Sequence, residues 1–279
     1  MFPPYLQRLC VAAACCLTCI LVTQGLRAKP HVPRALWVWG EADSALPAWA
    51  AARGIDTLLF EIPTSRFNAL STREVIGSAQ KQGQQVWALS GHAHWARSPR
   101  SAKRWVRAVA QQEGIAGVVL DVEPYLLDEW DTDRNRVERA YLRMLKLARR
   151  ASSDLPLMAA VPFWFDHDTY RNASGTLAER VAARVDALVV MAYRDELSVG
   201  DGIVALARGE IEVAARLDKV AMVALQTAAD DLDKLTFFEE DRDALGRAVM
   251  AIEGTPGFGG VALHHYRAYR ELRGGSEDS

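Results

Sequence analysis

Residues 117–125 read GVVLDVEPY, an aliphatic run that ends in two acids and a proline. The aliphatic, β-branched part predicts a buried strand. Side chains two residues apart on a strand point to the same side, so Val119, Asp121 and Glu123 share one face. The other face is entirely aliphatic and suits packing against helices. The stretch therefore predicts a strand that presents two carboxyl groups to the interior of a fold at its carboxyl end.

Apolar runs of this kind recur along the chain and alternate with amphipathic segments. They are nearly continuous hydrophobic segments, as expected of parallel strands that are buried on both faces. They lie at residues 35–39, 56–62, 85–90, 117–123, 157–163, 187–193, 220–226 and 259–265.

The segments between the apolar runs have helical periodicity. The clearest is 134–151, where five apolar residues share one face and Arg and Lys lie opposite. Segments 68–83 and 241–254 each end in a glycine suited to a helix C-terminus. Eight strands alternating with helices over about 250 residues predict an α/β fold, a single-domain (β/α)8 TIM barrel.

A doubly wound open sheet is the alternative architecture. It would usually carry a glycine-rich phosphate loop after the first strand. Residues 37–47, WVWGEADSALP, contain one glycine, so nothing favours dinucleotide binding and we expect no cofactor.

The first 28 residues have the features of a secretory signal. An apolar run of 14 residues, Leu9–Val22, follows Arg8 and precedes a small residue at Ala28. This run is shorter than the roughly 20 residues of a membrane span. We predict a signal peptide at 1–28, the barrel domain at 29–273 and a polar tail at 274–279, in a secreted or periplasmic protein. An uncleaved N-terminal membrane anchor is the alternative.

Cleavage at this point would change both the cysteine content and the charge. All four cysteines lie inside the segment, so the mature chain would have neither disulfides nor thiolate metal sites. The formal charge of −2 would become −4, because two of 33 basic residues and none of 35 acidic ones are removed. This charge gives no reason to expect nucleic acid as a partner, or a membrane beyond the N-terminal segment.

Polar and aromatic residues stand at the carboxyl ends of the predicted strands, which meet at one end of a barrel. Aromatic rings and hydrogen-bonding groups together suit a carbohydrate, whose ring faces are apolar and whose edges carry hydroxyls. We predict catalytic roles for Glu123, Asp121 and Tyr193. The predicted substrate-binding residues are Trp39, Glu61, His92, His94, Trp164, Asp195, Gln226, His264 and Tyr266.

The motif LDVE at 120–123 resembles the end of the DxDxE motif of glycoside hydrolase family 18, the chitinase-like proteins. The resemblance implies that Glu123 is the general acid and that Asp121 orients the N-acetyl group of the substrate. The acetamide oxygen then attacks the anomeric carbon, so no enzyme nucleophile is needed. VVMAY at 189–193 is similar to the MxYD of strand six, which implies that Tyr193 donates a hydrogen bond to the acetamide.

Two further segments resemble the same family, and three positions depart from its motifs. GGVALH at 259–264 is similar to the final-strand GGVMxW, and ALSG at 88–91 loosely matches SxGG. The departures are Val119 in place of the earlier acid, Arg194 in place of the Asp after the tyrosine, and His264 in place of the tryptophan.

Other glycosidase families share parts of the pattern. Asp-x-Glu on strand four is similar to the family 25 lysozymes, whose opening Asp and final Trp-Gln-Tyr are missing here. The Glu-Pro resembles the large retaining clan, but that clan requires a strand-seven Glu where this chain has Gln226.

The sequence therefore predicts a barrel that acts on a glycan by general-acid catalysis, and the family 18 resemblance implies a glycan that contains N-acetylhexosamine. Two alternatives stay open. One is a degenerate barrel that binds carbohydrate without cleaving it. The other is a metal-dependent hydrolase or deacetylase that uses His92 and His94 with Asp121 or His264. No metal site is part of the preferred prediction.

Overall fold

Eight parallel strands close into a barrel in the computed structural model, which describes residues 32–40, 42–197, 200–253 and 255–274. Each strand pairs with the next along the chain, and β1 also pairs with β8. This closure confirms the (β/α)8 prediction and excludes the open sheet. The strands are β1 Arg34–Val38, β2 Thr57–Glu61, β3 Gln85–Ser90, β4 Gly117–Leu120, β5 Leu157–Pro162, β6 Ala187–Met191, β7 Val220–Gln226 and β8 Phe258–His264.

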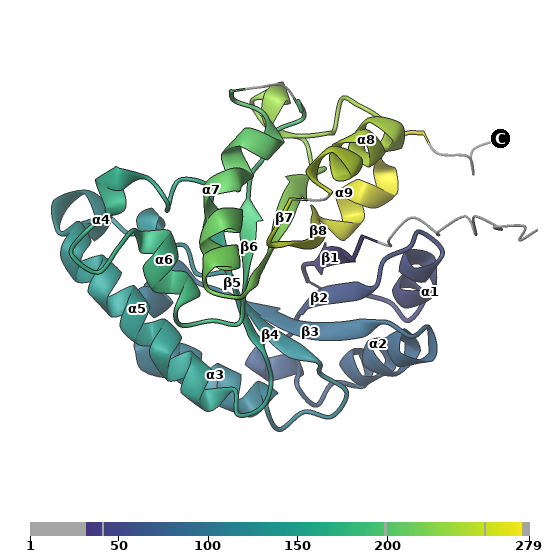
Figure 1. Ribbon diagram of the computed structural model, residues 1–279. Coiled ribbons are helices and arrows are strands. Elements are labelled where there is room, and N and C mark those ends of the chain that lie inside the picture. The colour runs from purple at the N-terminus through teal and green to yellow at the C-terminus, as the bar shows by residue number, and fades with distance from the viewer. Residues whose placement is uncertain (1–31, 41, 198–199, 254, 275–279) are drawn as a thin grey trace, which may run out of the picture. The chain divides into compact units, whose positions relative to one another are not determined.

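Helices surround the barrel and connect consecutive strands (Figure 1). The α-helices are α1 Leu46–Ala51, α2 Leu70–Lys81, α3 Pro99–Val109, α4 Glu129–Thr132, α5 Arg134–Ala151, α6 Leu177–Ala182, α7 Ile203–Arg216, α8 Arg242–Ile252 and α9 Tyr266–Glu271. Short 3-10 helices lie at Thr64–Arg66, Ala93–Ala96, Pro124–Leu126, Asp168–Tyr170 and Asp233–Leu235.

The predicted helices agree closely with those observed. Helix α5 has the predicted bounds, and the Asp133 side chain caps its start by accepting a hydrogen bond from the Arg136 N–H. The predicted stop after α2 is confirmed by Gly83, whose φ of 74° favours glycine. The corresponding glycine after α8 lies outside the described residues, as does the predicted signal segment.

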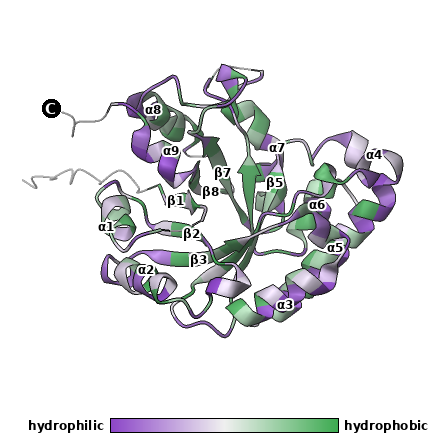
Figure 2. Cartoon of the chain, turned by 180° about the vertical axis from the view of Figure 1, so that it is seen from behind, coloured by the Kyte–Doolittle hydropathy of each residue, from purple (hydrophilic) through white to green (hydrophobic). Residues whose placement is uncertain are grey.

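Alternation along the strands divides the core into two layers. Val119 belongs to a cluster inside the barrel, whereas Val118, Leu120 and Val122 belong to the cluster between the strands and the helices. The strands are mostly hydrophobic, and most hydrophilic residues are on the helices and loops (Figure 2). This arrangement confirms that Val119 faces the barrel axis. Asp121 and Glu123, two and four residues later, follow it at the end of the barrel.

Strand β4 ends at Leu120, three residues earlier than the apolar pattern suggests. The Asp121 N–H still donates to the Ser90 carbonyl at 3.1 Å, so contact with the β3 side continues for one more residue. Gly91 makes this approach possible, because a Cβ there would lie 1.7 Å from the Asp121 carbonyl oxygen. Asp121 and Glu123 therefore lie on the chain as it leaves the sheet.

Within the described ranges, no helix is long and apolar enough to cross a membrane.

Candidate functional site

The carboxyl ends of the eight strands form one end of the barrel, here called the mouth. Inward-facing positions continue past the inner core and reach the mouth as polar and aromatic residues. Trp39 and Tyr193 pack on the inner cluster of hydrophobic side chains. The residues that extend the inward set at the mouth are Trp39, Glu61, Asp121, Tyr193, Gln226 and His264.

Asp121 has an unusual environment for a carboxyl group. Its Oδ1 is buried and has no hydrogen-bond partner among the described residues. Burial, followed by the charge of Glu123, raises the pKa of Asp121 from 3.8 to about 7. Asp121 therefore titrates near neutral pH, beside the Glu123 carboxyl group.

Glu123 is held by a residue that the sequence pattern did not indicate. The hydroxyl of Tyr125 donates a hydrogen bond to Oε2 of Glu123. Burial, followed by the Glu123 charge, raises the pKa of Tyr125, so its hydroxyl keeps its proton and remains a donor. The proline before Tyr125 starts a 3-10 turn that brings the ring back beside the carboxyl group. The only sequence signal for this contact is the order Glu123, Pro124, Tyr125.

Two further tyrosines lie within the electrostatic reach of the pair. Burial raises the pKa of Tyr193, and the charges of Asp121 and Glu123 raise it further. The same two charges act on Tyr141, which comes from α5 and is 0% exposed. Tyr193 was predicted as a donor at this place, whereas Tyr141 was not, because helical periodicity marks it only as a core residue.

A hydrogen-bonded chain of three side chains fixes one wall of the mouth. The Trp39 Nε1–H donates to Nε2 of His264 at 3.0 Å, and Nδ1 of His264 lies 2.9 Å from Oε1 of Gln226. The backbone N–H groups of Thr227 and Ala228 also donate to that oxygen, which identifies it as the acceptor. His264 therefore carries its proton on Nδ1.

The neutral state of His264 agrees with its surroundings. Burial, followed by the charge of His265, lowers the pKa of His264 from 6.5 to about 4. His264 is thus an uncharged orienting group for the Trp39 indole over most of the physiological pH range. The Tyr193 ring lies on its other side, with centroids 6.0 Å apart.

An aromatic cluster lies beside Glu123. The Trp164 ring contacts Tyr125 edge-on, with centroids 5.1 Å apart. Trp164 is partly exposed, so part of its ring surface remains available to a ligand. The cluster includes Tyr125, Trp130, Trp164, Phe165 and Tyr170.

Three predicted binding residues make contacts that do not involve Asp121 or Glu123. Glu61 accepts a hydrogen bond from the Gly40 N–H at 2.7 Å, and its Oε2 lies 3.5 Å from an Arg66 nitrogen. These contacts tie the end of β1 to the end of β2, so Glu61 has a structural role whether or not a ligand reaches it.

Tyr266 and Asp195 have surroundings of other kinds. Tyr266 packs edge-on against Trp49 of α1, with centroids 5.2 Å apart, and its hydroxyl accepts a hydrogen bond from Arg270. The Asp195 N–H donates to the Lys234 carbonyl, and its carboxylate acts electrostatically on Glu240. The structure does not bring these two residues together with Asp121 and Glu123.

His92 and His94 stack on each other, with ring centroids 5.3 Å apart, and both are exposed. Among the residues that the structure describes, no group of three or more His, Cys, Asp or Glu side chains could hold a metal ion. The third ligand that the metal-hydrolase alternative requires, from Asp121 or His264, does not join this pair. The ligand set expected for a metal-dependent hydrolase, His92 and His94 with Asp121 or His264, is therefore wrong for the described residues.

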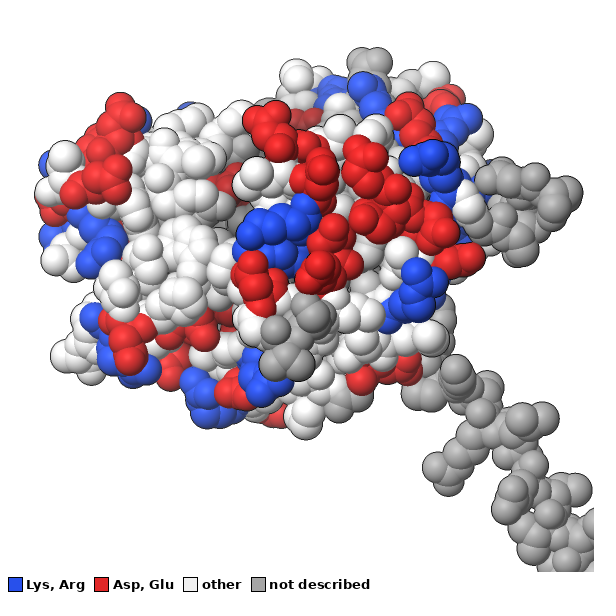
Figure 3. Space-filling model, turned by 90° about the horizontal axis from the view of Figure 1, so that it is seen from above, with Lys and Arg blue, Asp and Glu red and all other residues white. Residues whose placement is uncertain are grey.

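Acidic side chains gather on part of the surface seen from above (Figure 3). The segment between β7 and α8, which follows the carboxyl end of a strand, carries several of them in exposed positions: Asp230, Asp231, Asp233, Glu239 and Asp241. They give this side of the mouth a negative potential, which disfavours polyanionic ligands.

Solved structures with the same fold include several glycoside hydrolases. A chitinase from Chromobacterium violaceum aligns with a TM-score of 0.56 and 13% identity, over 85% of this chain and 96% of that one. A family 18 chitinase from Cycas revoluta, solved in complex with (GlcNAc)3, aligns with a TM-score of 0.54 and 13% identity, over 84% and 95%. A β-glucuronidase from Bacteroides uniformis aligns with a TM-score of 0.57 and 12% identity, over 85% of this chain and 31% of that one.

No family model and no curated protein sequence matches the chain. At these identities the structural likeness concerns the fold. It confirms the closed (β/α)8 barrel, whose fold is similar to that of the chitinase structures.

Proposed function

We propose that this protein is a glycoside hydrolase that cleaves a glycan containing N-acetylhexosamine, with Glu123 as the general acid. The observation that carries the proposal is the carboxyl pair at the mouth. Asp121 and Glu123 interact electrostatically there, and the Tyr193 and Tyr125 hydroxyls lie close to the same charges. Asp121, whose pKa is raised to about 7, can hold a proton near neutral pH next to Glu123, and a positioned carboxylic acid can deliver a proton to a leaving group.

In the proposed reaction, Glu123 transfers its proton to the glycosidic oxygen as the bond from that oxygen to the anomeric carbon breaks. The acetamide oxygen of the sugar forms the new bond to that carbon, and Asp121 and Tyr193 orient the acetamide. Water then opens the resulting ring and returns a proton to Glu123. The inward residue at the end of β7 supports a route without an enzyme nucleophile, because it is the amide Gln226, held by two backbone N–H groups.

The surroundings of the pair support a carbohydrate as the ligand. Trp39 and Trp164 can each offer a ring face, and the carboxyl and hydroxyl groups can bind the sugar's edges. The acidic residues between β7 and α8 favour a neutral or positively charged glycan over a polyanionic one.

The test is the exchange of Glu123 for glutamine. Glu123→Gln keeps the size and hydrogen-bonding capacity of the side chain but cannot supply a proton. Hydrolysis of N-acetylglucosamine oligomers should fall by at least about 100-fold, while affinity for them stays within a few-fold. Glu129→Gln is the matched control, because Glu129 lies six residues away on α4 and pairs with Arg97. It should hydrolyse as the parent does.

Two outcomes would redirect the proposal. A Glu123→Gln variant that cleaves as fast as the parent would remove Glu123 from the mechanism. A parent that binds the oligomers without cleaving them would identify a carbohydrate-binding barrel, the main alternative.

We also propose that the chain is exported and that the mature protein begins near Lys29. The apolar run and the small residue at Ala28 support this proposal. N-terminal sequencing of protein recovered outside the cytoplasm tests it, and Met1 on a cytoplasmic protein would refute it.

A further inference from the structure

Two acids meet inside the protein, away from Asp121 and Glu123. Asp166 follows β5, and Glu210 lies on α7 with 0% exposure. Oε1 of Glu210 accepts a hydrogen bond from the Asp166 N–H at 3.0 Å. The Asp166 and Glu210 carboxyl groups also influence each other's pKa through a side-chain hydrogen bond. A hydrogen bond between two carboxyl groups requires one proton between them.

In the part of the chain that the structure describes, neither acid forms an ion pair with Arg or Lys. Oε2 of Glu210 and Oδ1 of Asp166 are buried and have no hydrogen-bond partner there. The other charged groups that act on Asp166 are His167, whose Nε2 is 3.8 Å from Oδ1, and Glu212, which adds a like charge. Burial, followed by the charge of Asp166, raises the pKa of Glu210 to about 10. Glu210 therefore holds the proton at neutral pH and can donate it to Asp166.

The backbone of α7 is shaped to accept Asp166. A Cβ on Gly209 would lie 1.6 Å from Oδ2 of Asp166, so the carboxyl group rests directly against the helix. Any side chain at position 209 would displace it. Asp166 is thus held by two contacts with α7. Its N–H donates to Glu210, and its carboxyl group packs against Gly209.

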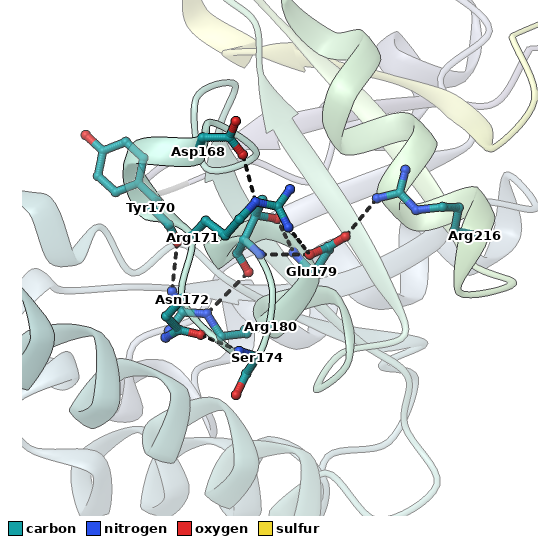
Figure 4. A network of polar contacts seen from close by, with 9 residues as sticks. Asp168, Tyr170, Arg171, Asn172, Ser174, Glu179, Arg180 and Arg216 are labelled. Atoms are coloured by element: carbon teal, nitrogen blue, oxygen red, sulfur yellow. Dashed lines mark hydrogen bonds and ion pairs between the residues drawn. The ribbon is translucent and has the colours of Figure 1, made fainter.

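This attachment lies two residues from Trp164, whose ring contacts Tyr125 at 5.1 Å. The later part of the same segment has its own network (Figure 4). Arg171 pairs with Asp168, and Arg216 of α7 pairs with Glu179. These ionic contacts are largely exposed and lie beyond Asp166. The part that carries Trp164 is therefore connected to α7 by half-buried Asp166 and buried Glu210.

We propose that Asp166 and Glu210 form a hydrogen-bonded carboxyl pair that positions Trp164 beside Glu123, which makes Glu210 a positioning residue for glycan binding. This inference rests on the proposed function only where it concerns the glycan. Glu210 bonds Asp166, which lies two residues along the chain from Trp164. The Trp164 ring packs on Tyr125, and Tyr125 bonds Glu123.

The test compares two substitutions at one position. Glu210→Gln can still accept from the Asp166 N–H and donate to its carboxylate, so it mimics the protonated acid. Glu210→Ala can do neither. With (GlcNAc)3 as the probe, we expect Glu210→Gln to bind as the parent does at pH 7. Glu210→Ala should bind about tenfold more weakly, the cost of disturbing one aromatic anchor.

A double-mutant cycle shows whether the effect passes through Trp164. If it does, Glu210→Ala combined with Trp164→Ala should bind no more weakly than Trp164→Ala alone. Arg208→Gln is the matched control, since it removes one charge from the exposed side of the same helix. Additive losses in the cycle, or unchanged binding by a folded Glu210→Ala variant, would overturn the proposal.

A readout that needs no ligand separates this inference from the proposed function. The protein is labelled with 5-fluorotryptophan, and the Trp164 resonance is identified by its loss in Trp164→Phe. Raising the pH toward 10 should shift this ¹⁹F resonance in the parent and not in Glu210→Gln, because two charged carboxylates repel. If the Trp164 resonance has the same pH dependence in the parent and in Glu210→Gln, the positioning role is overturned. A parent with the expected ¹⁹F behaviour that binds none of the oligomers would count against the glycan function alone.

Discussion

The Trp39 indole donates a hydrogen bond to Nε2 of His264 at 3.0 Å, and this contact fixes the imidazole in its neutral form. A ring nitrogen that accepts a hydrogen bond cannot carry a proton, so the proton resides on Nδ1, toward Gln226. The residue at the end of β8 therefore supports an aromatic wall of the mouth and does not act as an acid.

The first prediction concerns the stability of the protein in acid. The pKa of His264 is about 4 in the folded state and 6.5 in the unfolded state, so the unfolded chain binds the proton first as the pH falls. Between pH 6.5 and 4 this group should lower the free energy of unfolding by up to about 3 kcal/mol. His264→Gln should lack that part of the decline.

Urea denaturation of both proteins at pH 7 and pH 4.5 measures this difference. Two parallel pH dependences would show that His264 can be protonated without loss of its contacts.

The second prediction concerns Asp121 at higher pH. Its pKa is about 7 in the folded state and 3.8 in the unfolded state, so the folded protein binds more protons between these values. Stability from this group is present below pH 3.8 and declines as the pH rises to 7. Asp121→Asn should raise the free energy of unfolding at pH 8 by up to about 4 kcal/mol and leave it nearly unchanged at pH 4. Turnover should fall in the same variant.

Glu123→Gln provides the control for the cause of this shift. Burial is the larger cause and the Glu123 charge the smaller, so this substitution should lower the pKa of Asp121 only partly. Carboxyl ¹³C NMR measures the titration directly. An Asp121→Asn variant that is less stable at pH 8 than its parent would contradict the assignment.

The third prediction concerns the Tyr125 hydroxyl. Tyr125→Phe keeps the ring among Trp130, Trp164 and Phe165 but removes the donor to Glu123. We expect kcat to fall by about tenfold, the usual scale for a hydrogen bond to a charged group, with KM and the melting temperature little changed. Tyr170→Phe is the control, because Tyr170 lies in the same cluster and its hydroxyl does not contact Glu123. Equal effects of both substitutions would argue that packing, and not the hydrogen bond, is responsible.

The fourth prediction concerns Trp39 as a binding surface. Trp39→Ala should weaken binding of (GlcNAc)3 by about tenfold or more, since a buried aromatic anchor contributes at least that much. Trp39→Phe should lose less, because it keeps a ring face and loses the donor to His264. Isothermal titration calorimetry measures both.

Trp87→Phe is the matched control, because Trp87 packs on the same inner cluster from β3 and its indole bonds Gln85. If Trp87→Phe weakens binding as much as Trp39→Ala, the effect belongs to the barrel core and not to the mouth.

The sequence by itself determined the architecture and the direction of the key acids. Eight apolar runs separated by amphipathic segments specify parallel strands covered by helices, because each run must be buried on both faces. Alternation then specifies that Val119 and Asp121 share a face, since side-chain direction on a strand depends only on position along the chain. Helix α5 was predicted with its observed bounds because its apolar stripe is a local pattern of the sequence.

Only the tertiary structure decided what each side chain at the mouth contacts. Glu61 faces inward as the alternation predicts, yet its carboxylate already accepts a hydrogen bond from the Gly40 N–H and pairs with Arg66. Tyr141 reaches the charged pair from α5, and Tyr125 from a turn after the strand, so neither could be found from strand periodicity. The proton position on His264 depends on Trp39, 225 residues away in the chain. Partners brought together by the closure of the barrel set these hydrogen bonds and pKa shifts, whereas sequence patterns report only which face a residue occupies.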